Sequence, residues 1–196
     1  PDGRRAGRSY GRAIPVTIPA MPDAPGRRLV RAVWAATALA AAVGLGLAVL
    51  APWLAARGSG TAARTVYALF SPVCHQLPGR CFALFGRPMA VCGRCLGIYA
   101  GFAAGALVYP FVRGFRPAAL PSARVFALAI LPMAVDGLAG VTGLWRSPIG
   151  VRAATGLVWG ALLPYYFVPG VADALAARRR RRAAAALERA AGKKVE

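Results

Sequence analysis

The residues best suited to chemistry lie in one short stretch of the chain, between Ser71 and Phe102. This stretch holds every cysteine of the 196-residue sequence and its single histidine. They are Cys74, His75, Cys81, Cys92 and Cys95. Thiolate sulfur and imidazole nitrogen bind metal ions such as zinc, and paired thiols exchange electrons with disulfides. Their concentration in an otherwise apolar chain predicts one sulfur-rich site.

The pair Cys92 and Cys95 has the Cys-x-x-Cys spacing, in the letters "CGRC", at the predicted start of a helix. Two thiols at this spacing lie on one helical face or one tight turn, so they can close a disulfide or hold one metal ion. The free N–H groups at a helix N-terminus favour a thiolate, and Arg94 adds positive potential. We therefore expect a lowered thiol pKa at this pair.

Three kinds of chemistry are compatible with the cluster on residue types alone. Structural disulfides suit an oxidising location, and four cysteines allow three pairings. A redox-active dithiol suits Cys92 and Cys95. A metal site, with zinc as the candidate cofactor, uses His75 as well, although adjacent residues such as Cys74 and His75 rarely bind one ion together.

The composition is that of a membrane protein, because 58% of the residues are hydrophobic. The formal net charge is +19, yet the basic residues form blocks at both ends and short clusters between apolar runs. Membrane topology produces this arrangement, whereas a nucleic-acid interface concentrates the charge on one face. The pattern favours the lipid bilayer as partner and disfavours nucleic acid.

Four apolar stretches are long enough for a membrane helix, which needs about 20 residues. The expected fold is all-α, an integral membrane bundle of four transmembrane helices with a Cys/His-bearing loop. The helices are expected at about 32–56, 91–112, 125–145 and 153–172. A disordered basic tail is expected over residues 1–28, the transmembrane domain over 29–173 and a basic helical tail over 174–196.

The orientation follows from the basic residues near the helix ends. The N-terminal tail, the loop after the second helix and the C-terminal tail are arginine-rich, and four crossings put them on one side. We expect a multi-pass protein of the cell membrane with both termini in the cytoplasm and the cysteines facing outward. The run Arg178–Arg182 acts as a topology signal or binds anionic lipid headgroups.

Asp136 is the single acidic residue between Ala24 and Ala172, and it lies inside the third predicted helix. A carboxylate at this depth is costly and marks a packing contact or a functional site. Depth estimates from the outer end predict a hydrogen bond between Asp136 and Tyr99, with Arg94 within reach. These three are the candidate catalytic residues.

The arginines at the outer end have two interpretations. Arg80, Arg87, Arg146 and Arg152 can ring an outward pocket suited to a lipid phosphate, or they can be ordinary headgroup-level residues. The candidate substrate-binding residues are Arg80, Arg94 and Gln76.

Four motifs resemble one prokaryotic membrane-protein family, the domain of unknown function 2085. They are "CHQLPGR", "FGRPMAVCGRCLGIYAGF", "LPMAVDGL" and "RAATGLVWG", in this order. Cys81 stands where the family usually has serine, so the resemblance implies a shared set of three cysteines and one histidine. That set matches a zinc site in number and kind, with Cys74, His75, Cys92 and Cys95 as ligands. No activity comes with the family.

The sequence therefore favours a membrane protein with a Cys/His metal site, extending to a metalloenzyme that acts on a lipid-soluble substrate. One alternative is a membrane thiol-disulfide oxidoreductase that uses Cys92 and Cys95. Another is a non-catalytic scaffold or small transporter with structural cysteines. Whether the protein is an enzyme stays open at this stage.

Overall fold

The computed structural model describes residues 26–116 and 120–192. The expected disordered tail therefore lies almost entirely outside the described residues. The elements are α1 (Arg27–Ala56), α2 (Gly60–Phe70), the 3-10 turn η1 (Pro78–Arg80), β1 (Ala83–Leu84), β2 (Arg87–Pro88), α3 (Gly93–Arg113), α4 (Ala123–Val141) and α5 (Ile149–Gly192).

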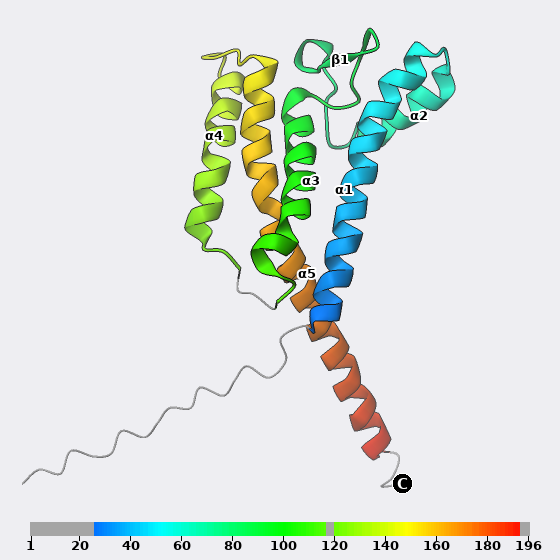
Figure 1. Ribbon diagram of the computed structural model, residues 1–196, viewed down its shortest axis with the longest axis vertical. Coiled ribbons are helices and arrows are strands. Elements are labelled where there is room, and N and C mark those ends of the chain that lie inside the picture. The colour runs from blue at the N-terminus through cyan, green and yellow to red at the C-terminus, as the bar shows by residue number, and fades with distance from the viewer. Residues whose placement is uncertain (1–25, 117–119, 193–196) are drawn as a thin grey trace, which may run out of the picture.

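Four of these helices, α1, α3, α4 and α5, are long and apolar enough to cross a membrane. They alternate in direction, so that the start of α1 and the far end of α5 share one end of the bundle (Figure 1). The sulfur-rich loop lies at the opposite end, between α2 and α3. The all-α fold with four such helices and a cysteine-bearing loop is confirmed.

Several helix boundaries differ from those expected. α1 begins at Arg27 and not near residue 32, and α5 begins at Ile149 and not near residue 153. α4 ends at Val141, where Gly143 (φ +77°) turns the chain back, and not near residue 145. α5 is a single helix of 44 residues, so the basic segment expected from residue 174 continues the last crossing. At 1.5 Å per residue this helix is about 66 Å long. It exceeds a hydrocarbon core of about 30 Å and extends beyond the bundle (Figure 1).

The loop end of the bundle has its own apolar core. Val66 and Phe70 of α2 pack with Ala48 and Ala51 of α1 and with the segment 89–91 that leads into α3. Before this segment, β1 and β2 pair antiparallel around a two-residue turn whose Phe85 and Gly86 both have positive φ, 54° and 71°. Such turns match the twist of a tight hairpin. The hairpin returns the chain to the start of α3.

α3 and α5 run parallel and touch backbone to backbone. Three glycines spaced four residues apart on α3 face carbonyl oxygens of α5. A Cβ atom would lie 2.0 Å from Ala153 O at Gly97, 2.3 Å from Leu157 O at Gly101 and 2.1 Å from Ala161 O at Gly105. Any side chain there would overlap the neighbouring helix, so glycine sets the distance between the two helices.

Glycines of α5 repeat the arrangement from the other side. A Cβ atom at Gly156 would lie 2.3 Å from Arg94 O, and one at Gly160 would lie 2.3 Å from Ile98 O. α4 instead contacts α5 through its rings, with Phe126 5.3 Å from Tyr166 between centroids. The first turn of α3, which carries two cysteines, is therefore held directly against α5.

We predict that Gly101→Ala lowers the free energy of unfolding by about 1–3 kcal/mol, because the added methyl group overlaps Leu157 O. Gly46→Ala is the matched control, because nothing lies within 4 Å of its Cβ position in α1. Alanine there should be neutral or stabilising by up to about 1 kcal/mol. Unfolding midpoints in detergent measure both, and equal effects would contradict the glycine contact.

Candidate functional site

Three sulfur atoms converge at the N-terminal end of α3. The Sγ atoms of Cys74, Cys92 and Cys95 all lie within 4.8 Å of one another. Cys74 follows the turn after α2, Cys92 is the N-cap of α3, and Cys95 lies in the first turn of that helix. All three thiols are free. Two segments that are 18 residues apart in the sequence therefore supply one cluster.

Backbone geometry joins the two segments. Cys92 has an extended backbone conformation (φ −69°, ψ 163°), and its N–H donates a hydrogen bond to Cys74 Sγ at 3.1 Å. Gln76 has φ +53°, a conformation that non-glycine residues rarely adopt. Its Nε2 donates to Tyr67 O at 2.6 Å, and the Tyr67 hydroxyl donates to Pro88 O. The loop is thus tied to both α2 and the hairpin.

The other two candidate ligands lie outside the three-sulfur group. His75 is exposed, and its ring nitrogens are not within the 4.8 Å set. Cys81 is buried, with 5% of its surface exposed, but its sulfur is also outside the set. The structure therefore brings together three of the four ligands expected from the sequence, and His75 as a ligand stays a prediction.

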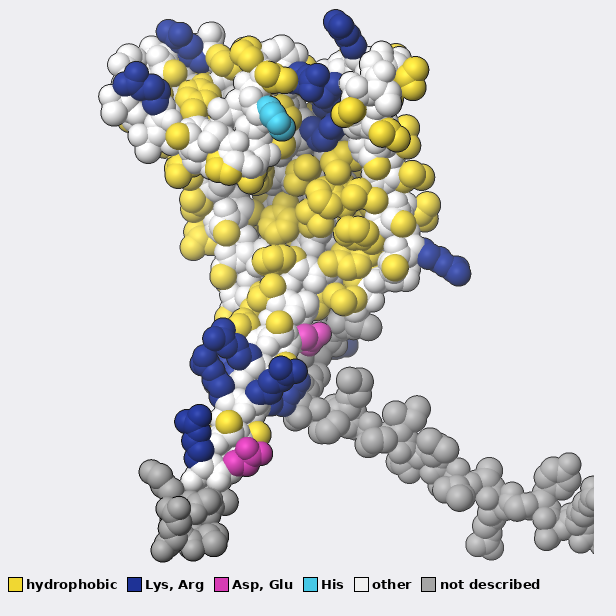
Figure 2. All heavy atoms as spheres, turned by 180° about the vertical axis from the view of Figure 1, so that it is seen from behind, with side chains coloured by type: hydrophobic (Ala, Val, Ile, Leu, Met, Phe, Trp, Pro, Cys, Tyr) yellow, Lys and Arg dark blue, Asp and Glu magenta, His cyan; other side chains and the backbone are white. Residues whose placement is uncertain are grey.

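A pocket of about 190 Å³ opens beside the sulfurs. His75 lines it, and so do all three candidate substrate-binding residues, Gln76, Arg80 and Arg94. Arg152 of α5 is a further lining residue. Figure 2 shows basic side chains gathered at this end of the molecule above a broad apolar area. The site is a small cationic pocket with sulfur on one wall.

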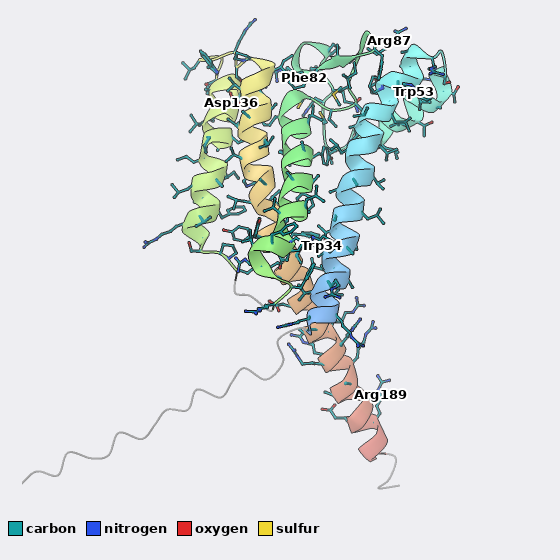
Figure 3. The ribbon with its side chains drawn as sticks, in the orientation of Figure 1. Trp34, Trp53, Phe82, Arg87, Asp136 and Arg189 are labelled. Carbon is teal, nitrogen blue, oxygen red and sulfur yellow. The ribbon has the colours of Figure 1, made fainter. Side chains whose placement is uncertain are left out.

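Asp136 pairs with Arg94 and not with Tyr99. The Arg94 Nη2 and Asp136 Oδ2 atoms form an ion pair between α3 and α4, with 23% and 6% of the two side chains exposed. Figure 3 labels Asp136 in the upper part of α4. Tyr99 packs edge to face on Phe70, with ring centroids 6.0 Å apart, and does not line the pocket. Of the three candidate catalytic residues, only Arg94 reaches the pocket wall.

Two glycines of α4 lie next to the arginines behind the pocket, at distances where an added Cβ atom would be in ordinary contact. A Cβ atom at Gly137 would lie 3.4 Å from Arg94 Nη1, and one at Gly140 would lie 3.5 Å from Arg152 Nη2. Arg152 was expected among the arginines that ring an outward pocket, although it was not among the candidate substrate-binding residues. Arg87 and Arg146, expected in the same ring, do not line this pocket.

Some polar atoms behind the pocket have no hydrogen-bond partner within the described residues. They are Arg94 Nε, Asp136 Oδ1 and Ser147 Oγ. Ser147 faces the carboxyl group of Asp136. Buried polar atoms are normally paired, and the Ser147 hydroxyl lies where it can donate to the Asp136 carboxylate. Arg94 Nε is then the atom of this set that lacks a partner among the described residues.

The thiols outside the membrane helices have opposite pKa shifts. The Cys92 thiolate is stabilised mainly by a hydrogen bond from the Cys95 thiol. The backbone N–H groups of Cys95 and Arg94 and the Cys74 thiol also donate to it. These hydrogen bonds outweigh burial and lower the pKa of Cys92 to about 5. Burial, with the nearby sulfurs, raises the pKa of Cys81 to about 11. For Cys92 the direction is the one expected at the start of this helix, and hydrogen bonds from neighbouring groups are its main cause.

Comparisons with known proteins match the same part of the chain. The family described as predicted membrane protein (DUF2085) matches residues 74–166. An uncharacterised protein of Methanocaldococcus jannaschii is 40% identical over 104 residues, which cover 53% of this chain and 67% of the relative. This chain belongs to the DUF2085 family.

A second relative, an uncharacterised protein of Methanothermobacter thermautotrophicus, is 33% identical over 90 residues. These residues cover 45% of this chain and 78% of the relative. No solved structure matches the chain. The DUF2085 match begins at Cys74 and ends within α5, so it includes all three clustered cysteines, the Arg94–Asp136 pair and Arg152. The family region is therefore the site together with α3, α4 and the first part of α5.

We predict that Cys92 in chelator-treated protein reacts with iodoacetamide at a rate that is already at its plateau at neutral pH. Its pKa of about 5 means that the reactive thiolate is lost only as the pH falls toward 5. Cys81, with its pKa of about 11, should react at a negligible rate below pH 9. Site-resolved mass spectrometry over pH gives both profiles, and a Cys92 midpoint near that of free cysteine would contradict the hydrogen-bonded thiolate.

We predict that Asp136→Asn lowers the free energy of unfolding by about 3–5 kcal/mol, because the Arg94 charge loses its partner while still largely buried. The double variant with Arg94→Gln should recover part of this loss, since neither charge is then unpaired. The free energies of unfolding of the wild type, both single variants and the double variant, measured in detergent, complete this double-mutant cycle. Additive losses would show that the pair does not interact.

Proposed function

We propose that this DUF2085 protein is a membrane metal-binding protein whose Cys74, Cys92 and Cys95 hold one ion, with zinc as the candidate. The observation that supports it most is the convergence of the three sulfurs within 4.8 Å. Sulfurs around a tetrahedral zinc ion at 2.3 Å lie about 3.8 Å apart, so a small contraction is sufficient. Cys74 Sγ accepts a hydrogen bond from the Cys92 N–H, and this bond would stabilise a Cys74 thiolate.

Three sulfurs would leave one ligand position of a tetrahedral ion to be filled from the pocket. His75 lines this pocket and is the protein residue proposed to supply that ligand. Because His75 is exposed, that position would also be accessible to a substrate. An exchangeable fourth position is the feature of catalytic zinc sites, and it is the basis for proposing a metalloenzyme for a lipid-soluble substrate. Arg94 on the pocket wall would orient that substrate, and Asp136 would hold Arg94 in place.

The orientation belongs to the same proposal. The described basic residues at the start of α1 and at the far ends of α3 and α5 lie at the end of the bundle opposite the sulfurs. The sulfur end also carries arginines, among them Arg57 and Arg87, but no run as dense as Arg178–Arg182. The positive-inside rule then places that end in the cytoplasm and the pocket at the outer surface of the cell membrane. The exposed run Arg178–Arg182 on the α5 extension would contact anionic lipid headgroups on the inner side.

The position of Cys92 favours a second candidate, thiol-disulfide exchange. Its thiolate would attack one sulfur of a partner disulfide, forming a mixed disulfide and releasing the partner's other sulfur as a thiolate. Cys95 would then attack Cys92 Sγ, releasing the second partner thiolate and closing the Cys92–Cys95 disulfide. Two electrons pass from the dithiol to the partner. The lowered pKa of Cys92 and the adjacent Cys95 suit this role.

We predict that the purified protein carries about one metal ion per chain after gel filtration. Elemental analysis by inductively coupled plasma mass spectrometry measures this content. Cys74→Ala, Cys92→Ala and Cys95→Ala should each reduce the metal content at least about tenfold, because a three-sulfur site loses one ligand. Cys81→Ala is the matched control, because Cys81 and Cys74 are equally buried, with 5% exposed. It should leave the metal content unchanged.

Two outcomes would oppose the metal proposal. One is wild-type protein without metal after purification and after addition of zinc. The other is an equal loss of metal in Cys81→Ala and Cys74→Ala, which would indicate a general effect on folding. A metal-free protein whose Cys92 and Cys95 oxidise reversibly with a disulfide partner would support thiol exchange instead.

A further inference from the structure

The pocket beside the sulfurs has more positive charge than the protein neutralises. Arg80, Arg94 and Arg152 line it. Asp136 is the one carboxylate between Ala24 and Ala172, and it is already paired with Arg94. Two guanidinium groups therefore have no Asp or Glu partner. The Cys92 thiolate on the same lining offsets one of these charges, which leaves one net positive charge in the metal-free protein.

Arg152 is the residue for which this imbalance matters most. It is buried, with only 8% of its surface exposed, and its Nε donates to Ser147 O at 3.1 Å. Asp136 lies close enough to interact electrostatically with it but is shared with Arg94. A buried guanidinium without a full counter-charge is costly, and a bound anion would offset that cost.

The size and surroundings of the pocket limit the kind of anion. A volume of about 190 Å³ holds more than single waters but is smaller than the roughly 300–1,000 Å³ of sites that enclose a whole drug-sized ligand. Val73 and Leu77 on the lining are 63% and 46% exposed, and a broad apolar area lies below (Figure 2). The pocket is suited to a compact anionic group whose apolar remainder stays outside.

We propose that the pocket binds a phosphate group, with Arg80 and Arg152 as its principal donors. Guanidinium groups bind phosphate oxygens in a bidentate way, and Arg152 is pre-oriented by its bond to Ser147. The phosphate belongs either to the headgroup of an anionic lipid or to a soluble phosphate ester.

This inference goes beyond the proposed metal site and does not require it. A divalent ion held by three thiolates carries one net negative charge. Three arginines and one carboxylate leave two positive charges, so one positive charge remains for a ligand even when the metal is bound. Metal binding and phosphate binding can therefore fail independently.

The test measures binding of dioleoyl phosphatidic acid, dioleoylglycerol and inorganic phosphate to the full chain in detergent by native mass spectrometry and competition. Wild-type protein should bind phosphatidic acid at least about tenfold more tightly than dioleoylglycerol, which has the same tails. Arg152→Lys should weaken phosphatidic acid binding by about tenfold, because lysine cannot make the bidentate contact of a guanidinium group. Arg80→Gln should weaken the same binding several-fold. Competition by inorganic phosphate would assign the site to soluble esters, and its absence to lipid headgroups.

Arg87→Gln is the matched control, because Arg87 is exposed at the same end of the molecule but does not line the pocket. It should leave binding unchanged. The inner arginines also attract anionic lipid, so the decisive quantity is the difference between Arg80→Gln and Arg87→Gln. Equal losses in these two variants, or equal binding of the two lipids by wild type, would overturn the proposal. Metal content of the same samples shows separately whether the sulfur site is intact.

Discussion

The backbone contact between α3 and α5 is the constraint on which the rest of the structure depends. Gly97, Gly101 and Gly105 let the two helices approach until carbonyl oxygens occupy the space that side chains would need. In a bilayer there is little hydrophobic gain in bringing helices together, so close packing of this kind replaces it. The contact begins at the first turn of α3 and fixes the height of the cysteines relative to α5.

The polar features follow from this height. Gly156 packs against the carbonyl of Arg94, and the Arg94 side chain forms its ion pair with Asp136 of α4. Arg152 lies one turn before Gly156 on α5, and its guanidinium group lies beside Gly140 of α4. The ion pair and the pocket are thus two results of one packing arrangement, and the sulfurs form the remaining wall.

Much of this arrangement was accessible from the sequence, for identifiable reasons. The length of the apolar stretches predicted the four helices, because the thickness of the bilayer sets how many apolar residues a crossing needs. The spacing of Cys92 and Cys95 predicted two of the clustered sulfurs, since local geometry decides it. The predicted hydrogen bond between Asp136 and Tyr99 was wrong, because the depth of a residue along a helix does not show which way its side chain faces. The resemblance had already set Cys81 apart from the other cysteines, and its sulfur lies outside the sulfur group. The pairing of β1 and β2 leaves almost no periodic signal in the sequence, because each strand has only two residues.

The parallel direction of α3 and α5 has an electrostatic consequence at the loop end. Each helix carries roughly half a positive elementary charge at its amino end, from peptide dipoles aligned along its axis. Antiparallel neighbours would cancel these fields, whereas Gly93 and Ile149 begin their helices side by side and the fields add. The carboxyl ends of α1 and α4 offset part of this at the flanks. The polypeptide backbone itself therefore attracts negative charge to the place where sulfur and guanidinium groups meet.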